Sequence, residues 1–419
     1  MNQSLAFDIM LSGESVFLTG PAGTGKTFLL NKFIKKAKKI GKKVSVTATT
    51  GIAATHLNGN TIHSWSGIGI NNHLDSGFID RLSKSRKEII QKTDILIIDE
   101  ISMLHDYRLD MVDEVCKKVR KNNLPFGGLQ VVFSGDFFQL PPINRENNEK
   151  SFFAIFSKSW QELNPVICYL TEQFRQDDED LNRVLNYIRD GNESEDIVSM
   201  LLARIGKEPE IVVTELHTTN FDVDSINNNM LDKIDSEETQ YSWSTTGSKN
   251  YLDNLSKSIL APEILRLKTG ALVMAVKNST DKKFVNGSLG VVIGFMPGNN
   301  YPIIKFNNGN ELAVFPESWE LRDGDKKLAI VTQVPLRLAW AITIHKAQGM
   351  TLDGAVIDLR KAFVEGMGYV ALSRLKNLDS LFLKGINNVA LATSQIAKEI
   401  DQMLRKKSKL DANRFVHLK

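Results

Sequence analysis

The chain has 419 residues, of which 42% are hydrophobic and 24% are charged, and its formal net charge at pH 7 is only +3. This is the composition of a globular protein with room for two or three domains, and the charge argues neither for nor against a polyanionic partner. No apolar run approaches the length of a membrane span, and the N-terminal stretch MNQSLAFDIM lacks the features of a signal peptide, so we expect a cytoplasmic protein without a membrane partner.

The first predicted strand, residues 15–19, runs into the glycine-rich stretch GPAGTGKT, and the helical sequence FLLNKFIKKAKK follows. Gly20, Gly25, Lys26 and Thr27 match the pattern G-x-x-x-x-G-K-[ST]. In such a turn the backbone N–H groups converge on an anion, the lysine reaches the β- and γ-phosphates, and the threonine hydroxyl ligates Mg²⁺. An ordinary glycine-rich loop is the alternative, but the strand before it and the helix after it favour a nucleoside triphosphate site.

Short apolar, β-branched runs continue to alternate with helical segments, which is typical of a parallel α/β sheet. The predicted strands of the first part are residues 15–19, 43–46, 94–98, 129–134 and 166–170. After residue 171 the alternation resumes with IVVTELHTTN, AITIHKAQG, GAVIDL and SLFLKGI, which indicates a second core of the same kind. Between the first two of these segments, strand-like runs such as GSLGVVIGFM and YPIIKF, with Asn-Gly turns, predict a small β-barrel insertion.

The segment DILIIDEISML predicts a buried strand that ends at two carboxylates, Asp99 and Glu100. Asp99 would hold Mg²⁺, usually through water, and Glu100 would orient and polarise the attacking water. For an isolated pair of acidic residues the alternative is a solvated surface. The apolar strand before the pair and the phosphate loop upstream favour catalysis.

The segment FSGDFFQLPP, residues 133–142, predicts a third loop at the end of a strand. Gln139 is suited to reach a γ-phosphate and report its loss, while Asp136 can hold the loop in place. A proline-terminated β-turn is the alternative. It accounts for the two prolines but not for Gln139, so we favour a phosphate sensor.

Two arginines from later in the chain could complete the neutralisation of charge in the transition state. These are Arg175 in LTEQFRQ and Arg374 in YVALSRL. If two RecA-like cores face each other, arginines of the second could close on a γ-phosphate that the first one binds. Surface salt bridges are the alternative for each arginine, and only the presence of the other motifs argues against them.

Eleven motifs occur in one order along almost the whole chain: GPAGTGKT, TATTGIAA, TIHSWSGIG, IIDEISML, PFGGLQVVFSGDFFQLPP, LTEQFRQ, LHTTNFDVDSIN, LVMAVKN, VNGSLG, TIHKAQGMTL and YVALSRL. Their order resembles that of the Pif (petite integration frequency) family of superfamily-one DNA helicases. PFGG leading to GDFFQLPP is the most specific of them, since it separates this family from most other P-loop ATPases.

The resemblance implies an α/β fold with two RecA-like P-loop motor cores, which translocate 5′-to-3′ on single-stranded DNA and unwind duplex DNA with ATP and Mg²⁺. We expect a first core at residues 1–160, with a wedge insertion at about 66–89. We expect a second core at residues 161–419, with a β-barrel insertion like a Src-homology-three domain at about 278–333. The expected partners are single-stranded DNA and forked or tailed duplex DNA, bound by a protein that is monomeric in solution.

The resemblance also implies roles for individual residues around the triphosphate. The expected catalytic residues are Lys26, Glu100, Gln139, Arg175 and Arg374. The expected nucleotide-binding residues are Gln3, Gly20, Ala22, Gly23, Thr24, Gly25, Lys26, Thr27, Asp99 and Gly349. Among these, Gln3 would read the adenine, and Thr27 and Asp99 would hold the metal. Ala347, in HKAQG, stands where a serine is common in the family.

A motor that ignores base sequence should hold phosphates and stack bases. The resemblance places on this DNA track Thr49, Thr50, Gly51, His63, Ser64, Thr343, His345, Lys346 and Gln348. A hydrogen-bonded structural role is the alternative for either histidine. For Trp65, beside Ser64, core packing is the expected role.

Other functions share some of these motifs. A ring-forming protein-remodelling ATPase has the phosphate loop and the acidic pair, but it does not need Arg374 or HKAQG. A non-catalytic DNA-binding module would need a degraded site, whereas Lys26, Asp99, Glu100 and both arginines are present. Within the helicases, a RecD-like or phage recombination-type enzyme is the nearest rival, followed by a DNA-stimulated ATPase without processive unwinding.

Overall fold

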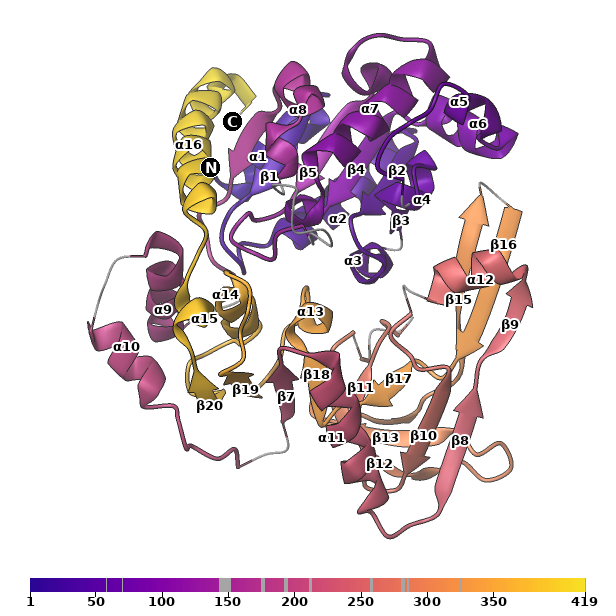
Figure 1. Cartoon of the computed structure of the whole chain (residues 1–419), viewed down its shortest axis with the longest axis vertical. Helices are drawn as coiled ribbons and strands as arrows, with labels where there is room; N and C mark the ends of the chain where they lie inside the picture. Colours follow the sequence, from indigo (N-terminus) through magenta and orange to yellow (C-terminus); the bar gives the residue numbers. More distant parts are fainter. Residues whose placement is uncertain are drawn as a thin grey trace. The chain divides into compact units, whose positions relative to one another are not determined.

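The computed structural model describes residues 1–57, 59–69, 71–142, 152–174, 178–191, 195–210, 213–256, 259–279, 283–284, 286–323 and 326–418. The chain divides into two compact units (Figure 1). Unit 1 comprises residues 1–177 and 393–419, drawn in indigo to magenta with the yellow C-terminal helix, and unit 2 comprises residues 178–392. Among the described residues, no helix combines the length and the apolar character that a membrane crossing requires.

Unit 1 is built on a six-stranded sheet with the order β3-β2-β4-β5-β1-β6. All of its neighbouring strands pair in parallel, as the alternation of strands and helices predicted. The strands are β1 (Val16–Thr19), β2 (Val44–Ala48), β3 (Asn60–Thr61), β4 (Ile95–Asp99), β5 (Gln130–Ser134) and β6 (Val166–Tyr169). The five strands that were predicted for this part are therefore confirmed, and β3 is added.

Helices cover both faces of this sheet. They are α1 (Gln3–Leu11), α2 (Lys26–Lys39), α3 (Gly51–His56), α4 (Ile62–Ser66), α5 (Phe78–Arg81), α6 (Lys84–Lys92), α7 (Asp106–Arg120), α8 (Lys158–Leu163) and α16 (Gln395–Arg414). Short 3₁₀ turns are η1 (Ile101–Met103), η2 (Pro125–Gly128), η3 (Ala154–Phe156) and η4 (Val416–Leu418). Along β4, Ile95 and Ile97 pack in one apolar cluster with α1 and α2, while Leu96 and Ile98 pack in another with α7. Burial on both faces explains why this strand reads as one continuous apolar run.

The expected boundary at residue 160 differs from the observed division of the chain. Strand β6 pairs with β1, and side chains of α16 accept hydrogen bonds from the backbone N–H groups of Ile167 and Tyr169 in β6, so both belong to unit 1. The stretch that was expected to be a wedge insertion, residues 66–89, carries α5 and the start of α6. Its Phe78 and Leu82 join the same apolar cluster as Trp65 and α7.

Unit 2 contains a second parallel sheet with the order β18-β7-β19-β20, as the later alternation predicted. Its strands are β7 (Thr214–His217), β18 (Ala341–Thr343), β19 (Ala355–Leu359) and β20 (Leu381–Ile386). Its helices are α9 (Glu179–Asp190), α10 (Glu195–Leu202), α11 (Asn220–Asp232), α13 (Ile344–Ala347), α14 (Met367–Leu372) and α15 (Asn388–Leu391).

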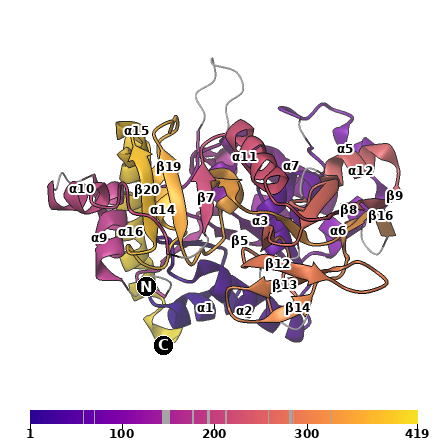
Figure 2. The ribbon, with the colours of Figure 1, turned by 90° about the horizontal axis from the view of Figure 1, so that it is seen from below.

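An antiparallel region interrupts unit 2 between β7 and β18, and it is longer than the predicted insertion. Five strands follow the order β14-β13-β12-β11-β17, while β10 pairs with β8, and β16 lies between β15 and β9. The strands are β8 (Glu238–Ser242), β9 (Ser244–Gly247), β10 (Ile264–Lys268), β11 (Leu272–Ala275), β12 (Leu289–Phe295), β13 (Pro302–Phe306), β14 (Glu311–Ala313), β15 (Glu317–Asp323), β16 (Lys326–Gln333) and β17 (Leu336–Leu338), with α12 (Lys249–Ser256) between β9 and β10. Strands β12, β13 and β14 lie side by side in Figure 2.

Strands β8 and β9 precede the predicted start of this insertion, and their sequences explain why they were not predicted. Strands β8 and β9 are mostly exposed and polar, so their sequences ETQYS and STTG carry little of the apolar alternation that marks a half-buried strand.

Candidate functional site

Three loops of unit 1 leave neighbouring strands at one edge of the parallel sheet. The phosphate loop follows β1, Asp99 and Glu100 close β4, and residues 135–142 follow β5, which lies between the other two strands. Parallel strands present their carboxyl ends together, where ligands bind in open α/β sheets. The sheet order therefore brings together three of the segments that the sequence predicted to act on one triphosphate.

The phosphate loop is shaped by glycines in backbone conformations that strain other residues. Gly20 and Gly25 have φ of +140° and +77°, and a Cβ on Gly20 would overlap the carbonyl oxygen of Leu170. The Nζ of Lys26 donates to the carbonyls of Gly20 at 2.8 Å and Pro21 at 2.9 Å. Helix α2 begins at Lys26, so the N–H groups of its first turn lie at the end of this loop. Such a turn fits the phosphates of a nucleotide.

Gln3 and Phe174 both lie against the phosphate loop. The Nε2 of Gln3, at the start of α1, donates to the carbonyl of Thr24 at 3.1 Å. The backbone N–H of Phe174 donates to the carbonyl of Gly23 at 2.9 Å, and the Phe174 ring is 58% exposed beside Gly25. Phe174 was not predicted as a site residue, although it lies within LTEQFRQ. A flat base can stack on the Phe174 ring, and the polar groups of the Gln3 amide can bind its edge.

Asp99 and Glu100 meet different environments although they are neighbours. Burial raises the pKa of Asp99, and the Ser134 hydroxyl, the Glu100 backbone and the charge of Lys26 act against that rise. Glu100 has φ 52° and ψ 43°, a left-handed conformation that costs a non-glycine residue about 1–3 kcal/mol. Its carbonyl accepts hydrogen bonds from the Thr49 hydroxyl at 2.9 Å and the Met103 N–H at 3.1 Å. The strand end is therefore held in an uncommon geometry.

The loop after β5 is tied by its own aspartate. The Oδ1 of Asp136 accepts from the N–H of Phe138 at 3.2 Å, and the Asp136 carbonyl accepts from the N–H of Gln139 at 3.0 Å. Asp136 thus holds the loop, as the sequence indicated. Gln139 is buried at the carboxyl edge of the sheet.

The two predicted arginines have different outcomes. Arg175 lies outside the described residues. Arg374, which follows α14 in unit 2, is 2% exposed, so it does not occupy the solvated position that a surface salt bridge would have. Its Nε donates to the carbonyl of Val370 at 2.9 Å, and its Nη1 donates to that of Met350 at 3.4 Å. The guanidinium therefore joins α14 to the loop that begins with HKAQG.

In unit 1, the segments predicted to contact DNA follow β2 and β3, which are parallel neighbours. Thr49 is 7% exposed, and both its N–H and its hydroxyl donate to the backbone of residues 99 and 100. The Thr50 hydroxyl accepts from the N–H of Ala53 at 3.2 Å, before the first turns of α3, which starts at Gly51. Thr49 therefore donates to the end of β4, whereas Thr50 accepts from the first turns of α3.

The second of these segments is helix α4. The N–H of Ser64 donates to the Thr61 hydroxyl at 3.2 Å. Burial, followed by the charges of Arg108 and His105, lowers the pKa of His63 to about 4, so its imidazole is neutral at pH 7. Trp65 packs in the apolar core, which confirms the expected role.

In unit 2, the sequence TIHKAQG forms the end of β18, the short helix α13 and the turn after it. The Thr343 hydroxyl accepts from the N–H of Lys346 at 3.3 Å and so caps α13. Burial lowers the pKa of His345, and burial with the charge of Arg337 lowers that of Lys346. Gln348 is buried, and Gly349 has φ +80°. Because these residues belong to the other unit, their place beside the residues of unit 1 stays a prediction.

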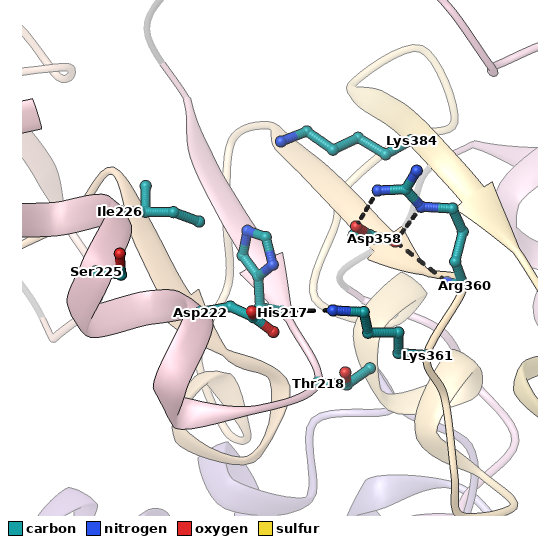
Figure 3. Close-up of a pocket in the computed structure, with 9 residues that line it drawn as sticks. All are labelled: His217, Thr218, Asp222, Ser225, Ile226, Asp358, Arg360, Lys361 and Lys384. Atoms are coloured by element: carbon teal, nitrogen blue, oxygen red, sulfur yellow. Dashed lines mark hydrogen bonds and ion pairs between the residues drawn. The ribbon is translucent and has the colours of Figure 1, made fainter. Parts of the chain in front are cut away.

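A pocket of about 290 Å³ lies in unit 2 beside the carboxyl ends of β7 and β19 (Figure 3). It was not predicted as a site, although the strand-end rule and the motif LHTTNFDVDSIN both point to it. Its basic side chains are paired with acids. Arg360 binds Asp358 at 2.7 Å, Lys361 lies 3.9 Å from Asp222, and Lys384 binds Glu215 at 2.7 Å. The pocket wall is therefore a mixed-charge surface.

A metal would have to share its ligands with the nucleotide. Within the ranges described above, no three His, Cys, Asp or Glu side chains gather into a metal site. Mg²⁺ is commonly held by one or two carboxylates together with substrate phosphates and water. Thr27 and Asp99, at the ends of the phosphate loop and of β4, fit a metal of that kind.

Comparisons with known proteins match nearly the whole chain. The model of the PIF1-like helicase family matches residues 2–207, and that of the DNA helicase Pif1 2B domain matches residues 250–295. The ATP-dependent DNA helicase Pif1 of Psychrobacter sp. is 40% identical over 97% of this chain and 71% of that protein. The ATP-dependent DNA helicase PIF1 of Xenopus laevis is 36% identical over 90% of this chain, which spans only 60% of the length of that relative.

Solved structures share the fold. A Bacteroides Pif1 in complex with ADP-AlF4 is 30% identical, with a TM-score of 0.84 over 97% of each chain. A Bacteroides Pif1 helicase in complex with ADP-AlF3 and single-stranded DNA is 31% identical, with a TM-score of 0.71 over 98% of this chain and 97% of its own. A structure of two coordinating Pif1 helicases at forked double-stranded DNA is 31% identical, with a TM-score of 0.69 over 98% of each chain.

Proposed function

Since this chain belongs to the PIF1-like helicase family, we propose that it is an ATP-dependent DNA helicase that translocates 5′-to-3′ on single-stranded DNA and unwinds duplex DNA. The observation that carries the proposal is the meeting of three loops at one sheet edge: the phosphate loop, the pair Asp99 and Glu100, and the loop of Gln139.

Hydrolysis follows from the chemistry of these loops. The loop N–H groups and Lys26 hold the β- and γ-phosphates of ATP, and Lys26 exchanges its bonds to the loop carbonyls for bonds to phosphate oxygens. Thr27 and Asp99 would hold Mg²⁺, which neutralises charge on the phosphates when bound. Glu100 accepts a hydrogen bond from the attacking water and orients it in line with the γ-phosphorus.

The side chains that lie on the phosphate loop recognise the base of the nucleotide. Gln3 reads the edge of adenine from the end of α1, and its hydrogen bond to Thr24 couples this reading to the loop. Gln139 reports the loss of the γ-phosphate, because its loop follows β5, between the strands that carry the other two loops.

Coupling to movement requires a second core. We assign each parallel sheet to a RecA-like core, with Arg175 and Arg374 closing on the γ-phosphate. Because Arg374 donates to the Met350 carbonyl, a shift of the HKAQG loop on DNA would be transmitted to this guanidinium. Arg374 must leave or adjust these internal bonds to reach a nucleotide.

The DNA track consists of Thr50, Gly51, His63 and Ser64 in unit 1 and of Thr343, His345, Lys346 and Gln348 in unit 2. Thr49, which was also expected on this track, directs its N–H and its hydroxyl to the backbone of residues 99 and 100. Residues 66–89 act as a wedge at the duplex, and the antiparallel region of unit 2 acts as a Src-homology-three-like clamp. Single-stranded DNA and forked or tailed duplexes are the partners, in keeping with the DNA complexes of the related helicases. We propose a monomer as the unit in solution.

The direct test is unwinding of two substrates that share one duplex and carry a 5′ or a 3′ single-stranded tail. We expect unwinding of the 5′-tailed substrate, dependent on ATP and Mg²⁺. Preference for the 3′ tail would overturn the assigned direction. DNA-stimulated hydrolysis without strand separation would support a translocating ATPase instead. Light scattering with and without the fork would measure the number of chains bound.

A further inference from the structure

Thr49 stands at the start of the segment that was predicted to contact DNA, yet its hydrogen bonds point into the catalytic strand. Strands β2 and β4 pair in register up to Ala48 opposite Asp99. One residue beyond, the Thr49 N–H donates to the Asp99 carbonyl at 3.2 Å and the Thr49 hydroxyl donates to the Glu100 carbonyl at 2.9 Å. Thr49 therefore extends the strand pairing by one side-chain bond.

These bonds use both of the donors that Thr49 possesses. A threonine has one backbone N–H and one hydroxyl proton, and a phosphate oxygen accepts hydrogen bonds but donates none. With both protons directed at backbone carbonyls, Thr49 has nothing left to donate to a DNA phosphate. Thr50 is different, because its hydroxyl accepts from the Ala53 N–H, a bond that does not use its own proton.

The Glu100 carbonyl accepts this extra bond at a residue with an uncommon backbone conformation. Glu100 is in the left-handed region, which turns its peptide out of the β ladder. The carbonyl then accepts from the N–H of Met103 as well as from Thr49. A backbone angle that is costly for glutamate persists only where its surroundings hold it, and Thr49 is one of the groups that do so.

We propose that Thr49 is a positioning residue for hydrolysis: it holds the backbone of Glu100 so that the carboxylate meets the attacking water, and it links this carboxylate to the DNA-facing segment that continues through Thr50 and α3. A displacement of that segment by DNA moves the acceptor peptide of Glu100. The inference rests on the proposed function for the role of Glu100, and it supplies a route from bound DNA to the rate of hydrolysis.

The test compares Thr49→Val, which keeps the shape and removes the hydroxyl, with Thr49→Ser, which keeps the hydroxyl. For each, kcat and KM for ATP are measured per folded molecule, without DNA and at saturating single-stranded DNA, together with the Kd for that DNA. Because small misplacements of catalytic groups cost about a hundredfold, we expect Thr49→Val to lower kcat by about ten- to a hundredfold in both conditions. KM for ATP and the Kd for DNA should change by less than about threefold, and Thr49→Ser should recover most of kcat.

An increase in the Kd for DNA with an unchanged kcat at saturating DNA would overturn the proposal and return Thr49 to the DNA track. Equal loss of kcat in the valine and serine variants would also overturn it, since the hydroxyl would then be irrelevant. If Thr49→Val does not fold, Thr49→Ala, which also removes the hydroxyl donor, replaces it, and an unaltered kcat in that variant counts against the proposal. The rate without DNA separates this question from the helicase assignment, because it tests Thr49 even in a protein that DNA does not stimulate.

Discussion

The carboxylate of Asp411 accepts a hydrogen bond of 2.8 Å from the backbone N–H of Ile167, 244 residues earlier in the chain. Ile167 lies in β6, the last strand in the order of the first sheet. Nearby, the Ser408 hydroxyl accepts from the Tyr169 N–H at 3.1 Å, and Asp401 accepts from the Tyr169 hydroxyl at 2.8 Å. Helix α16 thus covers an edge strand whose N–H groups would otherwise be open to another strand.

Asp411→Ala should therefore destabilise unit 1. The change leaves the buried Ile167 N–H without its acceptor, which typically costs about 1–3 kcal/mol. Asp411→Asn, which keeps an acceptor oxygen, is the matched control and should cost less. Urea unfolding measures both. Equal stability of the alanine variant and wild type would show that the edge of β6 does not need α16.

Glu100→Gln should preserve the binding of ATP and of DNA, because the phosphate loop and Asp99 are unchanged. Hydrolysis should fall by about a hundredfold or more, because an amide cannot accept the proton of the attacking water. Nucleotide affinity is measured with a fluorescent ATP analogue, and turnover is measured by phosphate release. Turnover at the wild-type rate would remove Glu100 from its assigned role.

Arg374→Ala should suppress DNA-stimulated hydrolysis by at least about a hundredfold while nucleotide affinity stays within a few fold, because an arginine finger acts mainly in the transition state. Arg374→Lys is the matched control, since it keeps the charge without the planar fork, and it should also fail to restore full stimulation. Thermal unfolding must accompany both measurements, because Arg374 also bonds to the Val370 and Met350 carbonyls. Equal losses with and without DNA would argue against a finger that acts on closure.

Lys346→Ala should weaken the binding of single-stranded DNA similarly for all base compositions, because a lysine reads charge and not sequence. Removal of one phosphate contact should flatten the slope of log affinity against log salt by about 0.7. Burial and the charge of Arg337 lower the pKa of Lys346, whereas a nearby phosphate would act in the opposite direction and favour its charged form. Titration of labelled oligonucleotides at several salt concentrations gives the slope. An unchanged slope would contradict a phosphate contact even if the affinity fell.

His63 should make the stability of unit 1 depend on pH. Its pKa is about 4 in the folded chain and 6.5 without burial, so between these values the unfolded chain binds a proton that the folded one does not. The contribution of the neutral, buried His63 to the free energy of unfolding is complete above pH 6.5 and is lost as the pH falls towards 4. From pH 6.5 to 5 the loss should be about 2 kcal/mol. His63→Gln lacks this titration, so urea unfolding at pH 7 and pH 5 should show a smaller loss in the variant. Parallel losses would place His63 in a solvated environment.

The phosphate loop and the strands around it could be predicted from the sequence because their signals are local. A buried parallel strand needs only a short apolar run, and a phosphate loop needs glycines and a lysine at fixed spacing. The order of motifs was enough to indicate the family, which the comparisons confirm. Polar, exposed strands such as β8 and β9 lack such a signal, and the predicted insertion therefore began too late.

Tertiary structure alone decided which partners the polar side chains have. TATTGIAA reads the same whether Thr49 faces DNA or the carbonyl of Glu100, and only the pairing of β2 with β4 brings it to that carbonyl. The burial that lowers the pKa of His63, and the bond from Asp411 to β6, likewise depend on segments that are distant in sequence. Local spacing determines which backbone shapes and which chemical groups are available, whereas hydrogen bonds and burial arise between segments that meet only when the sheet has formed.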